Sequence, residues 1–242
     1  TYLSDRDYSS LEEIPVEDLK QLLLNHLQKG KMRSKDLKTN YIESMAQGSS
    51  STKNLSLYIN VGDKIRINGV AEVTNSDIEL KNGIIHEIDR VIGPPNITTF
   101  LNADPTFQLL RSAFTRESSY TYLELLQGSG ELSPFTLFAP TNNAFEALRT
   151  DFMGDSYNEF SSDFLSSVLS YHIISGTNLR SGEFDFNMIL TNDSGEIEVY
   201  ADENIYLTDE RERTANVIKK DIQANNGVIH SINKVLLPRE VF

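Results

Sequence analysis

Hydrophobic positions near the start of the chain follow the period of a helix. Between residues 15 and 30 the leucines fall at spacings that place them on one face of a helix. Pro15 suits the first turn of such a helix, and Gly30 suits its C-terminal end. The pattern therefore predicts a helix over residues 15–30.

Farther along, apolar and polar residues alternate. Residues 55–61 and 65–67 place every second side chain on an apolar face, as half-buried strands do. The pair Asn68-Gly69 follows directly and favours a two-residue hairpin turn, because both residue types tolerate positive φ. We predict two strands here, the second of which enters a hairpin.

The second half of the chain shows helices first and strands afterwards. Helical spacing predicts helices within residues 105–126 and at residues 161–171, and a short apolar strand is predicted at residues 135–139. After Gly176 the chain is mostly of extended character. Helices and strands that are segregated in this way predict an α+β fold.

One segment occurs twice in the chain. Residues 77–94 read DIELKNGIIHEIDRVIGP, and residues 221–238 read DIQANNGVIHSINKVLLP, at a constant offset of 144. A shorter match joins LKQLLLNHL at residues 19–27 to LSSVLSYHI at residues 165–173, at an offset of 146. The sequence therefore contains an internal duplication, which predicts two copies of one folding unit.

All four histidines fall within this duplication. His26 matches His172, and His86 matches His230. His172 ends an apolar helix face and His230 lies inside an apolar strand, so we interpret the histidines as structural residues whose ring nitrogens bond neighbouring segments. A metal site would need partners at a fixed spacing, such as His-Glu-x-x-His, and the sequence contains no such array.

The two copies do not begin at equivalent points. About 75 residues of its unit precede His172, whereas 25 residues precede His26. We expect two domains, at residues 1–95 and 96–242, of which the first lacks a front portion that includes one strand. A domain shortened in this way leaves a surface that is open to self-association.

Composition and charge narrow the range of partners. The absence of cysteine excludes disulfides and thiol catalysis. The net charge is −13, and most of it lies on residues 96–242, so the surface repels nucleic acids and anionic membranes. No apolar run approaches the ~20 residues needed to span a bilayer, and we expect membrane association only through a segment absent from this chain.

Catalytic and cofactor motifs are missing from the sequence. It contains neither a Gly-x-Ser-x-Gly elbow nor a phosphate-binding glycine loop, and the spacing of an EF-hand is absent. We therefore expect no enzyme activity, no cofactor and no bound metal.

Three blocks in the second half resemble the fasciclin (FAS1) domain family. They are FTLFAPTNNAF at residues 135–145, the pair Tyr171-His172, and NGVIHSINKVLLP at residues 226–238, in the family's order. The first half shows only the later features, with the last block at residues 82–94 and Asn25-His26 in place of Tyr-His. The resemblance covers nearly the whole chain, as one truncated and one complete domain.

This resemblance implies a compact β-sandwich or wedge with helices packed around it. In some animal members the Tyr-His pair and an Asp-Ile pair are tied to integrin binding. The residues that match these pairs are Tyr171, His172, Asp221, Ile222, Asp77 and Ile78. The residues expected to build the scaffold are His26, His86, His230, Asn226, Gly227 and Thr141. The Asn-Gly pair fits a turn, and Thr141 fits the cap of the helix that follows.

Two function classes remain open. The first is a secreted or cell-surface interaction module, from a secreted or lipid-anchored precursor, that binds an extracellular protein or polysaccharide. The second is a carrier of a small hydrophobic ligand, which uses a groove between sheet and helices. An exposed apolar patch would favour the first class, and a deep apolar cavity would favour the second.

Overall fold

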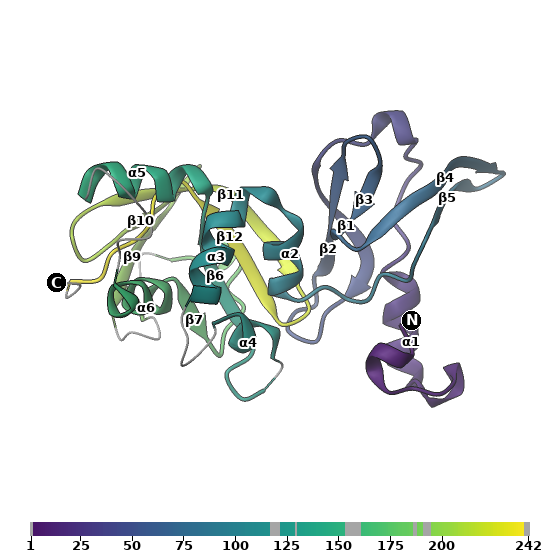
Figure 1. Ribbon diagram of the computed structural model, residues 1–242, viewed down its shortest axis with the longest axis horizontal. Coiled ribbons are helices and arrows are strands. Elements are labelled where there is room, and N and C mark those ends of the chain that lie inside the picture. Colours follow the sequence, from purple (N-terminus) through teal and green to yellow (C-terminus); the bar gives the residue numbers. More distant parts are fainter. Residues whose placement is uncertain are drawn as a thin grey trace. The chain divides into compact units, whose positions relative to one another are not determined.

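The computed structural model describes residues 2–116, 122–128, 130–152, 161–185, 188–190 and 195–239 (Figure 1). The chain forms two compact units. Unit 1 consists of Thr1–Asp104 and Gln223–Asn225, and unit 2 consists of Pro105–Ile222 and Asn226–Phe242. The predicted domain limits, 1–95 and 96–242, place the boundary slightly earlier in the chain and stay a prediction.

The helices of the described residues are short, and most belong to unit 2. The α-helices are α1 (Val16–Leu24), α2 (Ile97–Ala103), α3 (Gln108–Arg116), α4 (Tyr122–Gln127), α5 (Asn142–Phe152) and α6 (Ser162–Tyr171). Single 3₁₀ turns lie at Ser4–Arg6, Leu11–Glu13, Ser34–Asp36, Pro105–Phe107 and Ser181–Glu183. The predicted helix over residues 161–171 is confirmed as α6, and the Ser161 side chain caps its first turn by accepting from the Phe164 amide.

The sheet of unit 1 is antiparallel throughout and follows chain order. Its strands are β1 (Asn40–Gln47), β2 (Asn54–Val61), β3 (Ile65–Ile67), β4 (Ala71–Leu80) and β5 (Gly83–Ile88). The predicted turn between β3 and β4 is confirmed, with φ of 52° at Asn68 and 70° at Gly69. Strands β4 and β5 form a long hairpin (Figure 1), and β5 is the last strand of the sheet.

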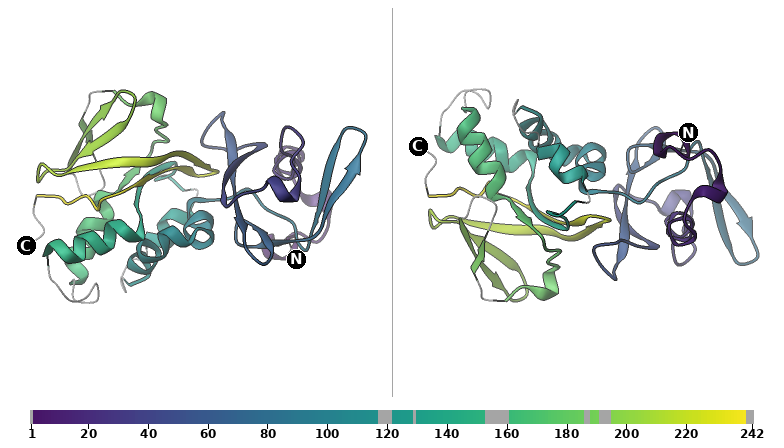
Figure 2. Two further views of the ribbon diagram at one scale, coloured as in Figure 1. Left: turned by 90° about the horizontal axis from the view of Figure 1, so that it is seen from above. Right: turned by 90° about the horizontal axis from the view of Figure 1, so that it is seen from below.

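The sheet of unit 2 is mixed. Its strands are β6 (Phe135–Pro140), β7 (Ile173–Ser175), β8 (Met188–Leu190), β9 (Glu196–Ala201), β10 (Ile205–Thr208), β11 (Thr214–Ala224) and β12 (Gly227–Ile232), and their order is β7-β6-β12-β11-β10-β9-β8. Strand β6, which confirms the predicted apolar strand, pairs with β12 in parallel. Helices lie on one side of the long strands β11 and β12, and β9 and β10 lie on the other (Figure 2). These elements confirm the α+β fold.

One predicted element ends early. Helix α1 stops at Leu24, six residues before Gly30, so the prediction of a helix over residues 15–30 is wrong at its C-terminal end. The physical reason lies in the next residue, because the buried Asn25 side chain donates to the carbonyl oxygens of Ile92 and Gly93, both at 3.1 Å. These distant contacts hold the chain in a turn that the local leucine pattern does not encode.

The cores of the two units differ in extent. In unit 2, one cluster of buried side chains draws on β6, α6, both long strands and the C-terminal segment, with Phe138, Tyr171 and Phe184 as its aromatic members. In unit 1 the corresponding cluster has four buried members, Leu57, Ile59, Ala71 and Ile92. The aliphatic residues around them are only partly buried.

Candidate functional site

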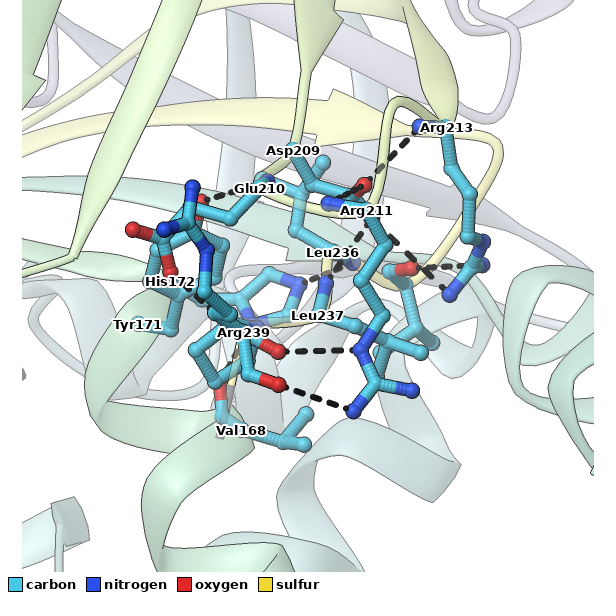
Figure 3. A network of polar contacts seen from close by, with 12 residues as sticks. Val168, Tyr171, His172, Asp209, Glu210, Arg211, Arg213, Leu236, Leu237 and Arg239 are labelled. Atoms are coloured by element: carbon cyan, nitrogen blue, oxygen red, sulfur yellow. Dashed lines mark hydrogen bonds and ion pairs between the residues drawn. The ribbon is translucent and has the colours of Figure 1, made fainter. Parts of the chain in front are cut away.

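The Tyr171-His172 pair lies at the C-terminal end of α6 and is buried. The exposed fraction is 0% for Tyr171 and 1% for His172. The Tyr171 hydroxyl donates to the Glu196 carbonyl oxygen and accepts from the Glu210 amide at 3.3 Å. Figure 3 shows this pair inside a network of polar contacts. A partner that leaves the domain folded therefore meets the residues around the pair, because both side chains are enclosed.

Both ring nitrogens of His172 are occupied. Nδ1 lies 2.6 Å from the Val168 carbonyl oxygen, to which only a ring N–H can donate, and Nε2 accepts from the Leu236 amide at 3.0 Å. These partners assign the neutral ring with its proton on Nδ1. Burial lowers the pKa of His172 to about 4, so the ring stays neutral at physiological pH. The imidazole thus ties α6 to the C-terminal segment.

A buried carboxylate completes this network. Asp209 accepts backbone amides from Arg211 at 3.0 Å, Arg213 at 2.9 Å and Leu237 at 3.0 Å, and the Arg213 guanidinium lies 3.8 Å from it. Arg211 and Arg213 also donate to carbonyl oxygens of the C-terminal segment (Figure 3). The turn after β10 and the C-terminal segment are therefore held together by hydrogen bonds to a carboxylate, which are the stronger kind.

The Asp221-Ile222 pair belongs to a second network, on β11. Asp221 has a φ of 62°, and its carboxylate accepts from the backbone amide of Ser181, at 2.8 Å, and from its hydroxyl. Burial raises the pKa of Asp221, but the two bonds from Ser181 and the charge of Arg180 outweigh it, so the pKa lies below its ordinary value. Ile222 is 2% exposed and packs in the core.

His230 lies in the same network. The Asp221 amide donates to Nδ1 of His230 at 3.4 Å, and Nε2 of His230 donates to the Leu179 carbonyl oxygen at 2.9 Å. Burial lowers the pKa of His230 as well. The structure therefore brings Asp221 and His230 together, whereas Tyr171 and His172 form the other network.

Unit 1 repeats the second network with matching atoms. Asp77 has a φ of 62° and accepts from the Ser34 amide at 2.9 Å and from its hydroxyl at 2.5 Å. These bonds lower the pKa of Asp77. The Asp77 amide points at His86 Nδ1 over 3.4 Å, and His86 Nε2 donates to the Met32 carbonyl oxygen at 3.0 Å. Ile78 follows in β4 and is half-buried.

Unit 1 repeats the first network only in part. His26 Nδ1 donates to the Leu22 carbonyl oxygen at 2.8 Å, and Nε2 accepts from the Ile92 amide at 3.0 Å, as the His172 ring does with its own partners. Unlike His172, however, His26 is exposed. The position of Tyr171 is taken by Asn25, which has no ring to fill the space.

The remaining motif residues also hold segments together. Asn226 is buried, and its amide nitrogen donates to the carbonyl oxygens of Leu126, at 2.7 Å, and Gly128, at 3.1 Å. Gly227 has a φ of 156°, and a Cβ there would lie 2.1 Å from the Phe135 carbonyl oxygen of β6. Thr141 precedes α5, and its hydroxyl accepts from the Ala144 amide at 3.4 Å.

Ser34 and Ser181, which donate hydrogen bonds to Asp77 and Asp221, were not among the predicted site residues. A signal was present, because Arg33-Ser34 and Arg180-Ser181 recur at an offset of 147. Asp209 was also missed, and the sequence carries no local sign of it, since a buried carboxylate in a turn looks like any solvated acidic residue. In unit 1 the arginine differs in its contact, because Arg33 pairs with Glu79 while Arg180 lies 3.6 Å from Asp221.

The chemistry left open to these groups is limited. Across the residues that the structure describes, no group of three or more histidine, aspartate or glutamate side chains could hold a metal ion. Within the same ranges, no helix is both long and apolar enough to cross a bilayer. The histidine ring nitrogens and the aspartate carboxylates of the predicted site already hold backbone groups of their own unit.

The sequence profile of the Fasciclin domain matches the chain at residues 3–94 and 105–238. Human periostin (Homo sapiens) is 30% identical over 229 residues, which cover 91% of this chain and 25% of periostin. Transforming growth factor-beta-induced protein ig-h3 of Sus scrofa is 28% identical over 69% of this chain and 23% of its own length. The chain thus spans about a quarter of these two relatives.

A solved structure has a similar fold. It is a FAS1 domain pair from the insect cell adhesion molecule Fasciclin I, with a TM-score of 0.58 over 92% of this chain and 81% of that one. The two sequences are 20% identical, so the likeness concerns the fold alone.

Proposed function

Because the chain belongs to the fasciclin domain family, we propose that it is a non-catalytic extracellular interaction module, which binds a protein or polysaccharide partner through its surface. The observation that carries the proposal is that the polar side chains of the predicted site hydrogen-bond to the protein's own backbone. His172 accepts from the Leu236 amide, His230 donates to the Leu179 carbonyl oxygen, and Asp221 accepts from the Ser181 amide. These bonds fix protonation states that do not favour acid–base chemistry at neutral pH.

Relatives support the same proposal. The similar solved structure comes from a cell adhesion molecule, and an adhesion role needs a stable scaffold with an accessible surface rather than a reactive centre. The networks around the histidines supply such a scaffold, since each one joins segments that are far apart in the chain. On this proposal the Tyr171-His172 and Asp221-Ile222 pairs shape the surface that a partner meets.

Charge limits which partners fit. The chain carries a net charge of −13, so a cationic or neutral surface associates with it more readily than an anionic one. Nucleic acids and anionic lipid surfaces are disfavoured on this ground. An extracellular protein with a basic patch, or a neutral polysaccharide, is the better electrostatic match.

A second candidate function has a specific observation behind it. Unit 1 contains a cavity of about 410 Å³, lined by aliphatic side chains from all five strands together with His26 and His86. This volume lies within the range of small-molecule sites. A carrier of a small hydrophobic ligand is therefore the alternative to a surface interaction module.

An adhesion assay tests the proposal. Surfaces coated with the whole chain are expected to retain cells, and to bind at least one member of a panel of purified extracellular matrix proteins and polysaccharides, more strongly than an albumin-coated surface does. Native mass spectrometry of the purified chain is the companion measurement. No retention in any assay, combined with a co-purified apolar molecule of small mass, would replace the interaction module by the carrier.

A further inference from the structure

One segment of unit 1 is strongly basic. Residues 29–38 (KGKMRSKDLK) contain five basic side chains and one acidic side chain, a net charge of +4. The chain as a whole carries −13, and the other residues of 1–95 hold seven basic and thirteen acidic side chains. The basic segment is therefore a local exception to the charge that disfavours anionic partners elsewhere on the chain.

The backbone of this basic segment is fixed to the rest of unit 1. The Met32 carbonyl oxygen accepts from His86, and Ser34 donates to Asp77 through both its amide and its hydroxyl. Leu37 packs against the core of the unit. Three points along the segment are thus held in place, which reduces the conformational entropy that a partner must remove when it binds.

The lysines of the segment lie on its outside. All four are exposed, namely Lys29, Lys31, Lys35 and Lys38. Lys31 lies 4.0 Å from the carboxylate of Glu79 on β4. Among the residues that the structure describes, no carboxylate forms an ion pair with the other three lysines. The charges of these three side chains are therefore available to a partner in solution.

The duplicated segment of unit 2 has the same anchors and a different charge. At an offset of 147, residues 176–185 (GTNLRSGEFD) carry one basic and two acidic side chains, a net charge of −1. Gly182 and Asp185 stand where unit 1 has Lys35 and Lys38, and both are exposed as well. Exposure of these positions is thus common to both units. The anchoring bonds do not require lysine, so the positive charge belongs to the surface of unit 1 alone.

The composition of the segment favours a polyanion over a protein surface. Protein interfaces are enriched in aromatic side chains at their centre and depleted in lysine. Residues 29–38 contain no aromatic side chain, and their two large apolar side chains, Met32 and Leu37, are half-buried. Without an aromatic ring the segment also offers no stacking platform to a single-stranded nucleic acid.

The small size of the segment favours a single narrow polymer. A bilayer or a DNA duplex extends well beyond ten residues, so most of its charge would meet the acidic remainder of the chain. Exposed charges more than about 8 Å apart are largely screened at physiological salt. A thin polymer that contacts only the segment is therefore little affected by the acidic residues farther away.

We propose that residues 29–38 bind an acidic polysaccharide, whose sulfate or carboxylate groups pair with Lys29, Lys35 and Lys38. At this surface an acidic polysaccharide fits better than the neutral one that the net charge of the whole chain favours. Release of counterions from the polymer supplies much of the affinity, which falls as the salt concentration rises. The proposal rests on the proposed function, an extracellular interaction module, and names one partner class and the surface that binds it.

Heparin, a sulfated polysaccharide, is the probe, added to the whole chain in a calorimetric titration. We expect saturable binding at physiological ionic strength and no binding of neutral dextran under the same conditions. Raising the salt concentration threefold is expected to weaken heparin binding roughly tenfold, because about three ion pairs with the polymer are lost to competing salt.

A variant of the chain makes the test specific to the segment. It combines Lys29→Gln, Lys35→Gln and Lys38→Gln, and it is expected to bind heparin at least tenfold more weakly than the parent. All three side chains are exposed, so the variant is expected to keep the melting temperature of the parent.

A matched control removes the same number of positive charges elsewhere. It combines Lys53→Gln, Lys219→Gln and Lys220→Gln, three positions that are also exposed. Both variants change the net charge of the chain equally, so a difference between them reports the segment and not the total charge. The control is expected to bind heparin within twofold of the parent.

Three outcomes overturn the proposal. One is the absence of saturable heparin binding to the parent, and another is equal binding by the two variants. The third is binding of phosphatidylserine-containing vesicles, duplex DNA or polyglutamate that is as tight as that of heparin and is lost in the segment variant, which would assign the segment to that class of polyanion. The adhesion assay is read separately, so a chain that retains cells without binding heparin loses this proposal and keeps the proposed function.

Discussion

The two copies of the duplicated segment show how much of a strand's environment comes from its neighbours. Strands β5 and β12 have nearly the same sequence, and each carries a histidine bonded to the same backbone positions. Nevertheless β12 is buried at every residue and β5 at none. The difference arises from β6, which covers β12 and brings Phe138 into the core. Burial in this fold therefore depends on a strand from elsewhere in the chain.

The same comparison shows that the hydrogen-bond networks do not depend on how deeply the strand is buried. Ser34, Asp77 and His86 repeat the bonds of Ser181, Asp221 and His230 although their surroundings are wetter. In unit 1 these bonds form although no strand matching β6 covers β5. The networks are thus common to both units, whereas burial of the strand accompanies the parallel neighbour in unit 2 alone.

The largest effect is expected from the two matched glycines. Gly227→Ala should lower the free energy of unfolding of unit 2 by about 4 kcal/mol, because the new Cβ collides with a backbone carbonyl oxygen that cannot move alone. Gly83→Ala should change it by no more than about 0.5 kcal/mol, as at an open site. Urea unfolding of both variants checks this. Equal losses of unfolding free energy in the two variants would mean that backbone conformation, and not the approach of β6, requires the glycines.

Acidification should lower the stability of unit 2, with the next largest effect. The pKa of His172 is about 4 when folded and 6.5 in the reference state, so the unfolded chain takes up a proton first as the pH falls. Stability of unit 2 is fully present above pH 6.5 and is lost as the pH falls toward 4, by about 3 kcal/mol at 1.36 kcal/mol per pKa unit. The lowered pKa of His230 acts in the same direction.

Urea titrations at several pH values between 7.5 and 4 measure this loss. His172→Phe serves as the control, because it removes one titrating ring and should flatten the slope while lowering stability at neutral pH. The Asp221 carboxylate does not affect stability between pH 7.5 and 4. Its pKa is lowered, so its contribution to stability disappears only below its ordinary value of 3.8. A parent protein with the same stability at pH 7 and pH 4.5 would contradict the buried neutral histidines.

Hydrogen exchange compares the two strands directly. Amides of Gly227–Ile232 are hydrogen-bonded on both sides of the strand, whereas β5 pairs on one side. We expect matched amides of Gly83–Ile88 to exchange roughly 100-fold faster, equivalent to about 2.7 kcal/mol of opening free energy. Measurements at low and high protein concentration exclude protection by a second copy. Equal exchange in both strands would show that unit 1 does not depend on a parallel neighbour for its stability.

Replacing the histidine of each strand should give a smaller difference. His230→Leu leaves the Leu179 carbonyl oxygen and the Asp221 amide without their partner in a dry core, which costs about 1–3 kcal/mol. His86→Leu removes the same two bonds, but water can replace them at a half-buried site, so the loss should stay below about 1 kcal/mol. Thermal unfolding of the two variants beside the parent measures both. An unchanged melting curve for His230→Leu would refute the structural role of this ring.

Sequence reasoning reached the fold through the features that repeat or alternate. The duplication, strand β6, the hairpin at Asn68-Gly69 and helix α6 all follow from local patterns that the packed structure keeps. The end of α1 does not, because the bonds of Asn25 to Ile92 and Gly93 span more than sixty residues of chain.

The candidate site divides in the same way. The histidines and the Asp-Ile pairs were found because they recur, and Ser34 and Ser181 could have been found by the same signal. The burial of Tyr171 and His172 could not, since it depends on β6, β9 and the C-terminal segment meeting at the end of α6. The bonds of Asp209 could not be predicted either, because two amides of the turn after β10 and the Leu237 amide of the distant C-terminal segment converge on this carboxylate.

The smallest effect is expected from removing divalent cations. Residues 96–242 hold most of the net charge of −13, which makes calcium binding a natural suspicion. However, the carboxylates of Asp209 and Asp221 already accept hydrogen bonds from amides and a hydroxyl, so they offer a cation few free lone pairs. We expect EDTA to shift the melting temperature by less than about 1 °C, which corresponds to a few tenths of a kcal/mol. Calorimetry with EDTA and with added calcium at constant ionic strength measures this, and a shift of several degrees confined to unit 2 would mean that its acidic surface binds a cation.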